Sequence, residues 1–166
     1  LIQLNAVKTS DIMTPRTVMS SLSASLTLGE LKDSQKLAGV FDHSRVPVFD
    51  KDADDVVGMV LRRDVLTAMA EDKFDRRLEE FMRPVDFIAE TLSVNRLLRR
   101  LLETGQHLVL VIDEYGGLAG LVTLEDVLEE ILGIEIVDEF DPAVDMRELA
   151  HRRRQQSMEK RSRPRK

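Results

Sequence analysis

The fold is decided by the stretch GLVTLEDVL at residues 120–128, because it repeats the stretch GMVLRRDVL at residues 58–66. The two share the pattern Gly-x-Val-x-x-x-Asp-Val-Leu at an offset of 62 residues. Upstream, DIMTP at residues 11–15 and EFMRP at residues 80–84 share Met-x-Pro at an offset of 69. Two landmarks in the same order indicate an internal repeat, which organises every other assignment.

Each copy shows the same succession of patterns, a short strand, a helix, two strands and a second helix. Thr27 and Ser93 stand where the N-cap of the first helix is expected in each copy. The last helix of the second copy has apolar residues at three- and four-residue spacing and therefore one apolar face. The expected strands are 17–21, 46–49 and 56–60, then 85–89, 108–112 and 118–122; the expected helices are 28–37 and 62–70, then 94–103 and 124–132.

The fold class that follows is α/β, more narrowly α+β, with tandem β-α-β-β-α repeats packed sheet to sheet. Residues 108–112 form a continuous apolar run, typical of a strand covered on both faces, and the following DEYGG is a hairpin signal. Halves of about sixty residues are marginal alone, so they are expected to bury surface against each other. We expect a linker at 1–9, the repeats at 10–71 and 72–133, and a disordered tail, acidic and then basic, at 134–166.

Composition narrows the function classes. The chain has 166 residues, no cysteine and a formal net charge of −6. Disulfides, thiolate metal sites and cysteine nucleophiles are therefore excluded, and no apolar run approaches the roughly 20 residues of a membrane helix. Residues 151–166 carry eight Lys or Arg and one acid, which leaves 16 basic and 29 acidic residues in the first 150. Such an acidic body is not typical of a nucleic-acid binder.

Thr123 and Asp126 are the leading candidates for a ligand site, because they follow the strand end at Val122 and open a helix. A helix N-terminus offers N–H groups and partial positive charge to a phosphate. The Thr123 hydroxyl could donate to a phosphate oxygen, and the Asp126 carboxylate could accept from both hydroxyls of a ribose. The alternative is a capping box without a ligand, in which Asp replaces the usual Glu or Gln. Both interpretations stay open at this point.

The first copy preserves only part of this pattern. Asp64 matches Asp126, but Leu61 stands where the second copy has Thr123. Leucine cannot bond a phosphate, while Arg62 and Arg63 could supply charge or could be plain surface residues. We therefore expect one good site, built on Thr123 and Asp126, and one degenerate site at Asp64.

Other chemical signals are weak. Residues 50–55 (DKDADD) imitate a calcium loop but lack its turn glycine and its final glutamate. The three histidines have no metal-ligand spacing, the glycines at 116–120 match neither phosphate-binding fingerprint, and no nucleophile and base can be paired. We therefore expect no metal site and no enzyme.

The motifs resemble a known family. SDIMTPR at 10–16, HSRVPV at 43–48 and DEYGGLAGLVTLEDVLEEI at 113–131 are similar to the CBS domain pair of bacterial CorC/hemolysin-type proteins, relatives of the CNNM magnesium transporters. The resemblance covers residues 8–139. It implies a membrane domain before residue 1, a homodimer of CBS pairs at the cytosolic face of the plasma (inner) membrane, and regulation of magnesium or cobalt transport by ATP with Mg²⁺.

The resemblance also implies which residues contact the nucleotide. His43 stands where many relatives have tyrosine, and a surface loop histidine is the alternative. Two rival functions stay open, an AMP or adenosine-ligand sensor and a dimerisation scaffold without a ligand. The expected contacts are Val122, Thr123 and Asp126 in the second copy, and Thr17, Met19, His43, Ser44, Arg45 and Pro47 in the first.

Overall fold

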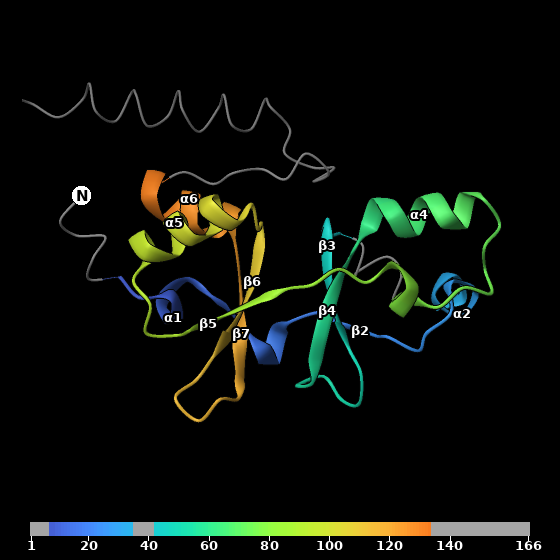
Figure 1. The fold of residues 1–166 in the computed structure, drawn as a ribbon, viewed down its shortest axis with the longest axis horizontal. Helices are drawn as coiled ribbons and strands as arrows, with labels where there is room; N and C mark the ends of the chain where they lie inside the picture. Colours follow the sequence, from blue (N-terminus) through green and yellow to red (C-terminus); the bar gives the residue numbers. More distant parts are fainter. Residues whose placement is uncertain (1–6, 35–41, 134–166) are drawn as a thin grey trace, which may run out of the picture. The chain divides into compact units, whose positions relative to one another are not determined.

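The computed structural model describes residues 7–34 and 42–133, and it builds them around two β-sheets (Figure 1). The expected tail from residue 134 lies outside the described residues, as do residues 1–6 of the expected linker. Within the described ranges, no helix combines the length and the apolar character needed to cross a membrane.

The first sheet has the strand order β2-β3-β4, from β2 (Leu22–Ser23), β3 (Arg45–Phe49) and β4 (Val56–Leu61). Strand β2 is parallel to β3, and β3 is antiparallel to β4. Helices α2 (Leu28–Asp33) and α4 (Arg62–Ala70) complete the expected β-α-β-β-α order. Their apolar faces pack on the sheet in one core that includes Leu28, Leu31 and Val65, each fully buried.

The second sheet joins β5 (Asp86–Ala89), β6 (Leu108–Ile112) and β7 (Leu118–Thr123) to a short N-terminal strand, β1 (Thr14–Pro15), in the order β1-β7-β6-β5. Helices α5 (Val94–Thr104) and α6 (Leu124–Leu132) belong to the same half. The first four residues of β6 are buried, which confirms a strand covered on both faces. The turn after β6 is held by Asp113, whose Oδ1 accepts from the N–H groups of Tyr115 and Gly117.

The two sheets pack against each other through a separate apolar cluster. Val56 and Met59 of β4 join Leu108 and Leu110 of β6 in this cluster, and all four are buried. A strand face that packs against a second sheet excludes water on both sides, so each half supplies the surface that the other needs. The expected packing of sheet to sheet is confirmed.

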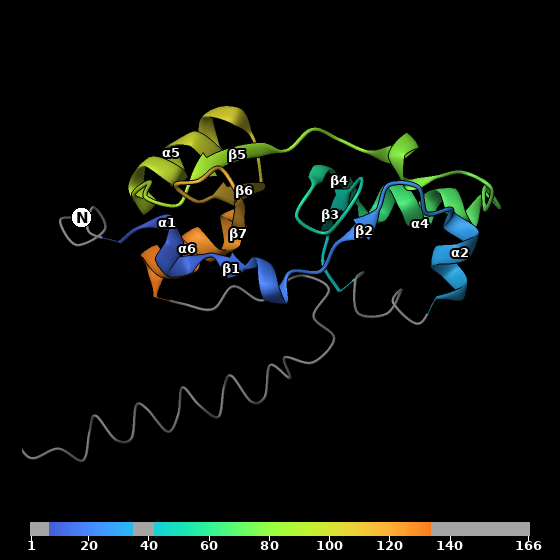
Figure 2. The same cartoon turned by 90° about the horizontal axis from the view of Figure 1, so that it is seen from below.

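Each Met-x-Pro landmark crosses to the other half. The first crossing segment (residues 8–15) contains α1 (Thr9–Ile12) and β1, and it lies on the second half, where β1 pairs with β7 (Figure 2). The second crossing segment (residues 77–84) contains the 3₁₀ helix η3 (Leu78–Phe81) and lies on the first half, where Arg83 pairs with Met59 of β4. The repeat thus creates two equivalent crossings.

The repeated glycines explain why the two landmarks occur together. A Cβ added to Gly120 would lie 2.2 Å from the carbonyl oxygen of Thr14, and one added to Gly58 would lie 2.8 Å from that of Arg83. Real Cβ atoms do not approach other atoms so closely, so each crossing segment needs a glycine beneath it.

Two expected elements differ from the structure. Residues 17–21 do not form a strand: Arg16–Val18 are a 3₁₀ turn, η2, closed by Met19 N donating to Arg16 O at 3.3 Å, and only Leu22–Ser23 pair as β2. The reason is the crossing, because the chain leaves the second sheet at Pro15 and reaches the first only at Leu22. Helix α2 ends at Asp33, since Ser34 is extended; its expected end at residue 37 lies outside the described residues.

Candidate functional site

Thr123 and Asp126 form a complete capping box at the start of α6. Thr123 donates to Asp126 Oδ2 twice, from its backbone N at 2.8 Å and from Oγ1 at 2.7 Å. In return, Asp126 N donates to Thr123 Oγ1 at 3.2 Å. Both bonds to the carboxylate end on Oδ2, so Oδ1 receives none of them. The capping box, one of the two interpretations that the sequence left open, is therefore formed, and Asp126 Oδ1 takes no part in it.

The start of α6 has fewer N–H groups to offer than the sequence suggested. Leu124 N donates to His107 O at 2.9 Å, and Asp126 N is used by Thr123. Among the first three helical N–H groups, only that of Glu125 is outside these bonds. Val122, one residue before the cap, is fully buried in the apolar core that α5 and α6 form with the second sheet, so only its backbone can face a ligand. A phosphate at this place would need further donors.

Thr17 and Met19 lie beside the strand that leads to this cap. Helix η2, which contains Thr17, contacts β7, and Met19 packs in the cluster between the sheets with Leu118 and Leu121 of β7. Thr17 is exposed, whereas Met19 is half-buried. The structure thus brings these two first-copy residues to the second half.

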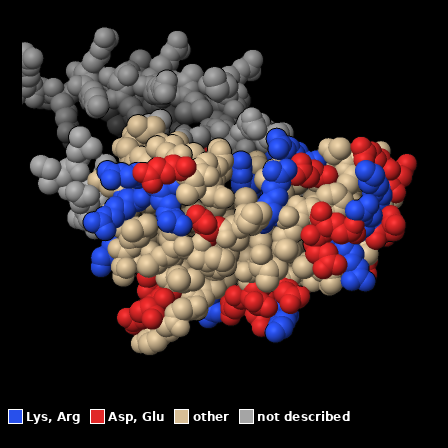
Figure 3. All heavy atoms as spheres, in the orientation of Figure 1, with Lys and Arg blue, Asp and Glu red and all other residues tan. Residues whose placement is uncertain are grey.

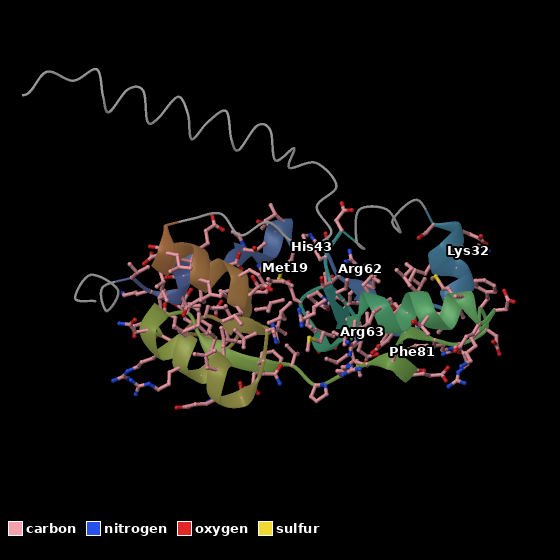
Figure 4. The ribbon with its side chains drawn as sticks, turned by 90° about the horizontal axis from the view of Figure 1, so that it is seen from above. Met19, Lys32, His43, Arg62, Arg63 and Phe81 are labelled. Atoms are coloured by element: carbon pink, nitrogen blue, oxygen red, sulfur yellow. The ribbon has the colours of Figure 1, made fainter. Side chains whose placement is uncertain are left out.

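The remaining first-copy candidates surround the start of α4. Ser44 O accepts from Arg62 N at 3.0 Å, and Arg45 and Pro47 of β3 are paired with Leu61 and Met59 of β4. Pro47 is buried, Ser44 and Arg45 are half-buried, and His43 is exposed. Figure 4 shows His43 and Met19 in the middle of the view, between the orange α6 and the green α4. No hydrogen bond or ion pair within the described ranges links residues 42–47 to the α6 cap.

Asp64 has a different environment from Asp126. Its Oδ2 accepts from Arg83 Nη2 at 2.7 Å, and its Oδ1 faces Arg63 Nε at 3.3 Å. Leu61 is the N-cap residue of α4 and gives no side-chain cap bond. The first copy thus has a carboxylate held by arginines where the second has one held by a threonine.

Arg83 is the residue that sequence reasoning missed. The repeat carries the signal, because the offset of 69 places Arg83 at the position of Thr14. On the face in Figure 3, acidic side chains lie along the lower edge and at the right-hand end, with basic ones among them, and a group of basic side chains lies over α5. A hollow of about 520 Å³ at the start of α5, lined by Ala89, Thr91, Leu92, Ser93 and Arg96, shares no residue with the site.

The sequence of the chain is similar to a known domain family and to several curated proteins. The CBS domain matches residues 10–71 and 78–133. A UPF0053 protein of Synechocystis sp. is 39% identical over 159 residues, covering 96% of this chain and 45% of that protein. The magnesium and cobalt efflux protein CorC of Vibrio cholerae is 37% identical over 141 residues, covering 85% of this chain and 47% of that protein. The chain therefore spans about half the length of these curated relatives.

Solved structures agree with the fold. The CBS domain of a bacterial CNNM/CorC family Mg²⁺ transporter in complex with ATP has a TM-score of 0.73 and 38% identity, covering 81% of this chain and 93% of that one. A CBS-domain pair with bound AMP from Klebsiella pneumoniae has a TM-score of 0.63 and 28% identity, covering 76% of this chain and 99% of that one.

Proposed function

We propose that this chain, which belongs to the CBS domain family as a pair of domains matching those of the CorC/CNNM magnesium and cobalt transporters, is the adenine-nucleotide sensor of such a transporter. The ligand we propose is ATP with Mg²⁺. The observation that carries the proposal is the Asp126 carboxylate. Its Oδ1 accepts none of the cap bonds, and it has no ion-pair partner in residues 7–34 and 42–133.

The cap at α6 suits a ribose. A carboxylate oxygen outside the cap can accept from a ribose hydroxyl without breaking an existing bond. The Thr123 hydroxyl has one proton, which it gives to Asp126 Oδ2. If it donates to a phosphate instead, a second ribose hydroxyl can replace it on Oδ2. Ligand binding would then replace the bond from the Thr123 hydroxyl to Asp126 with bonds to the phosphate and the ribose, and both carboxylate oxygens would still accept a hydrogen bond.

The first-copy residues suit the rest of the nucleotide. Arg45 is half-buried and forms no ion pair in the described part of the chain, so its guanidinium is available to a phosphate. Ser44, next to it, adds a hydroxyl. Met19 offers a polarizable apolar surface to the base. The related ATP complex supports a nucleotide of this size in this fold.

The N-terminal crossing segment suits transmission of the signal. Thr9 is fully buried, and both its backbone N and its Oγ1 donate to Leu92 O at 2.8 Å. The chain just before the first repeat is therefore attached to the second half. We propose that nucleotide binding shifts a homodimer of these modules at the cytosolic face of the inner membrane, and that residues 1–9 carry the change to a membrane domain. A ligand shifts such an equilibrium only by its differential affinity.

The test is thermal unfolding of the 166-residue chain with Mg²⁺-ATP, ATP alone and AMP. At about 100 times the dissociation constant, a ligand adds roughly 2.7 kcal/mol, which corresponds to a rise in Tm of about 5–10 °C for a chain of this size. We expect the rise in the wild type and its loss in Thr123→Ala/Asp126→Ala. The matched control is Thr27→Ala/Glu30→Ala, which removes the same capping box from α2 and keeps the response.

Two other functions are outcomes of the same test. A rise with AMP and none with Mg²⁺-ATP would replace the proposal by an AMP sensor, which the Klebsiella structure with bound AMP favours. No rise with any nucleotide at millimolar concentration would leave a dimerisation scaffold, which the complete capping box at Thr123 favours.

A further inference from the structure

We infer that Arg83 is a built-in occupant of the first copy's ligand position and that it limits the module to one nucleotide. The inference rests on the nucleotide site proposed at Thr123 and Asp126. It concerns the equivalent position around Asp64, where the guanidinium stands in the place of a ribose.

The two positions are equivalent in three dimensions as well as in sequence. Thr14 is paired with Leu121 of β7, and Arg83 is paired with Met59 of β4. The offsets of the repeat, 69 between the crossing residues and 62 between the strand residues, are those of the two landmarks. Arg83 is fixed in this position by two backbone bonds with Met59, at 2.9 Å and 2.7 Å.

The side chains at the two crossings differ in length and charge. Arg83 reaches the helix start and places Nη2 2.7 Å from Asp64 Oδ2, a distance typical of a charge-assisted hydrogen bond. At the other crossing, Thr14 is short and uncharged, and Asp126 has no cation beside it among the described residues. The equivalent carboxylates are therefore ion-paired in one half, at Asp64, and without an ion-pair partner among the described residues in the other, at Asp126.

A ribose at Asp64 would have to displace the guanidinium. Its neutral hydroxyls would replace a cation on the carboxylate and leave Arg83 without its partner, an exchange that disfavours binding. A second deficit adds to this, because Leu61 has no hydroxyl for a phosphate or for the cap. Leu61 and Arg83 thus distinguish the degenerate site from the good one, and both have a counterpart in the other copy. The neighbouring Arg63 is the weaker cation there, since it faces Asp64 Oδ1 at 3.3 Å and its side chain is 76% exposed.

The test transplants these counterparts. Leu61→Thr/Arg83→Thr gives the first copy the residues that the second half has at Thr123 and Thr14. Bound Mg²⁺-ATP per chain is counted by equilibrium dialysis, in the wild-type background and in Thr123→Ala/Asp126→Ala. We expect the ratio to double from one to two in the first background and to rise from zero to one in the second.

A charge control accompanies the transplant. Leu61→Thr/Arg83→Lys keeps a cation at Asp64 and is expected to stay at one nucleotide per chain. If Arg83→Thr impairs folding, as seen in thermal unfolding, Arg83→Gln in the same pairing removes the charge with a similar length. A ratio of two in the lysine variant would overturn the inference, because the cation would then not be the barrier.

The remaining outcomes separate the inference from the proposed function. A wild type that binds one nucleotide and a folded threonine or glutamine variant that still binds one would overturn the inference and leave the proposed function intact. A wild type that already binds two would also overturn the inference alone. If neither wild type nor variant binds, the proposed function falls and the inference falls with it.

Discussion

The starts of α6 and α4 occupy the same position in the repeat, yet they are held in different ways. At α6, all the bonds of the cap join Thr123 and Asp126, three residues apart. At α4, the carboxylate of Asp64 is bonded to Arg83, 19 residues away on the second crossing segment. Among the described residues, the Asp126 carboxylate is thus bonded only within its own cap, whereas the Asp64 carboxylate is bonded both to its neighbour Arg63 and to Arg83 of the second crossing segment.

The two helix starts therefore differ in which hydrogen bonds they can exchange for bonds to a ligand. A local cap can give up one bond to a ligand while the backbone around it stays in place. If the Arg83 guanidinium leaves Asp64, by contrast, the side-chain bond between the second crossing segment and the start of α4 is lost. Under the proposed function, two copies of one fold would thus differ in whether they bind a nucleotide.

The largest effect is expected where the crossings meet the strands. In Gly120→Ala the new methyl would meet backbone, the carbonyl oxygen of Thr14 at 2.2 Å, so β1 would have to move. In Gly58→Ala the two nearest atoms, at 2.5 Å and 2.7 Å, belong to the side chain of Met82, which can turn away, and the backbone clash that remains is the milder one, with the carbonyl oxygen of Arg83 at 2.8 Å. We expect losses in the free energy of unfolding of about 3 kcal/mol and about 1–2 kcal/mol, respectively, measured by urea unfolding. Equal losses would show that the two crossings are equally tight.

A smaller effect is expected at the caps themselves. Thr123→Ala and Thr27→Ala each remove a hydroxyl that accepts from the N–H three residues on, at 3.2 Å in both cases. Each should lower the free energy of unfolding by about 1 kcal/mol. Only Thr123→Ala should also weaken nucleotide binding, measured by calorimetry. Equal nucleotide affinity in the two variants would reduce Thr123 to a structural cap.

The smallest effect concerns pH. Hydrogen bonds from Thr27, first from its backbone N and then from its hydroxyl, lower the pKa of Glu30 from its ordinary 4.5. A folded-state pKa below the unfolded value gives stability that is present above pH 4.5 and is lost as the pH falls through the folded pKa. The stability difference between wild type and Glu30→Gln should therefore shrink on acidification, followed by thermal unfolding. A difference that is constant with pH would contradict this; Glu114→Gln, on the exposed hairpin, is the control.

Sequence periodicity predicted the elements that bury an apolar face. The bounds of α4, α6 and β6 agree with those expected, since caps, apolar spacing and turn residues mark them locally. The capping box was one of the two interpretations that the sequence allowed for Thr123 and Asp126, because these residues are three apart, and the structure confirms that the box forms. The partial match at Asp64 followed from the repeat.

The crossings were not predictable in the same way. A strand of two residues has no periodicity, and pairing between Thr14 and Leu121 joins positions more than a hundred residues apart. The expected strand at 17–21 failed for this reason, because local residues do not reveal that the chain is travelling between sheets. The ion pair of Arg83 with Asp64 likewise depends on the crossing.

The crossed segments bear on how such a pair could arise. Each half is completed by a segment that precedes the other half in the chain, at residues 8–15 and 77–84. This is the arrangement that two separate single-repeat chains reach by domain swapping. Joining them end to end turns the exchange into an intramolecular one, with a much higher effective concentration. The pair of repeats is then the smallest unit in which both halves are complete. A cut between the repeats would give two chains, each of which needs the crossing segment of the other.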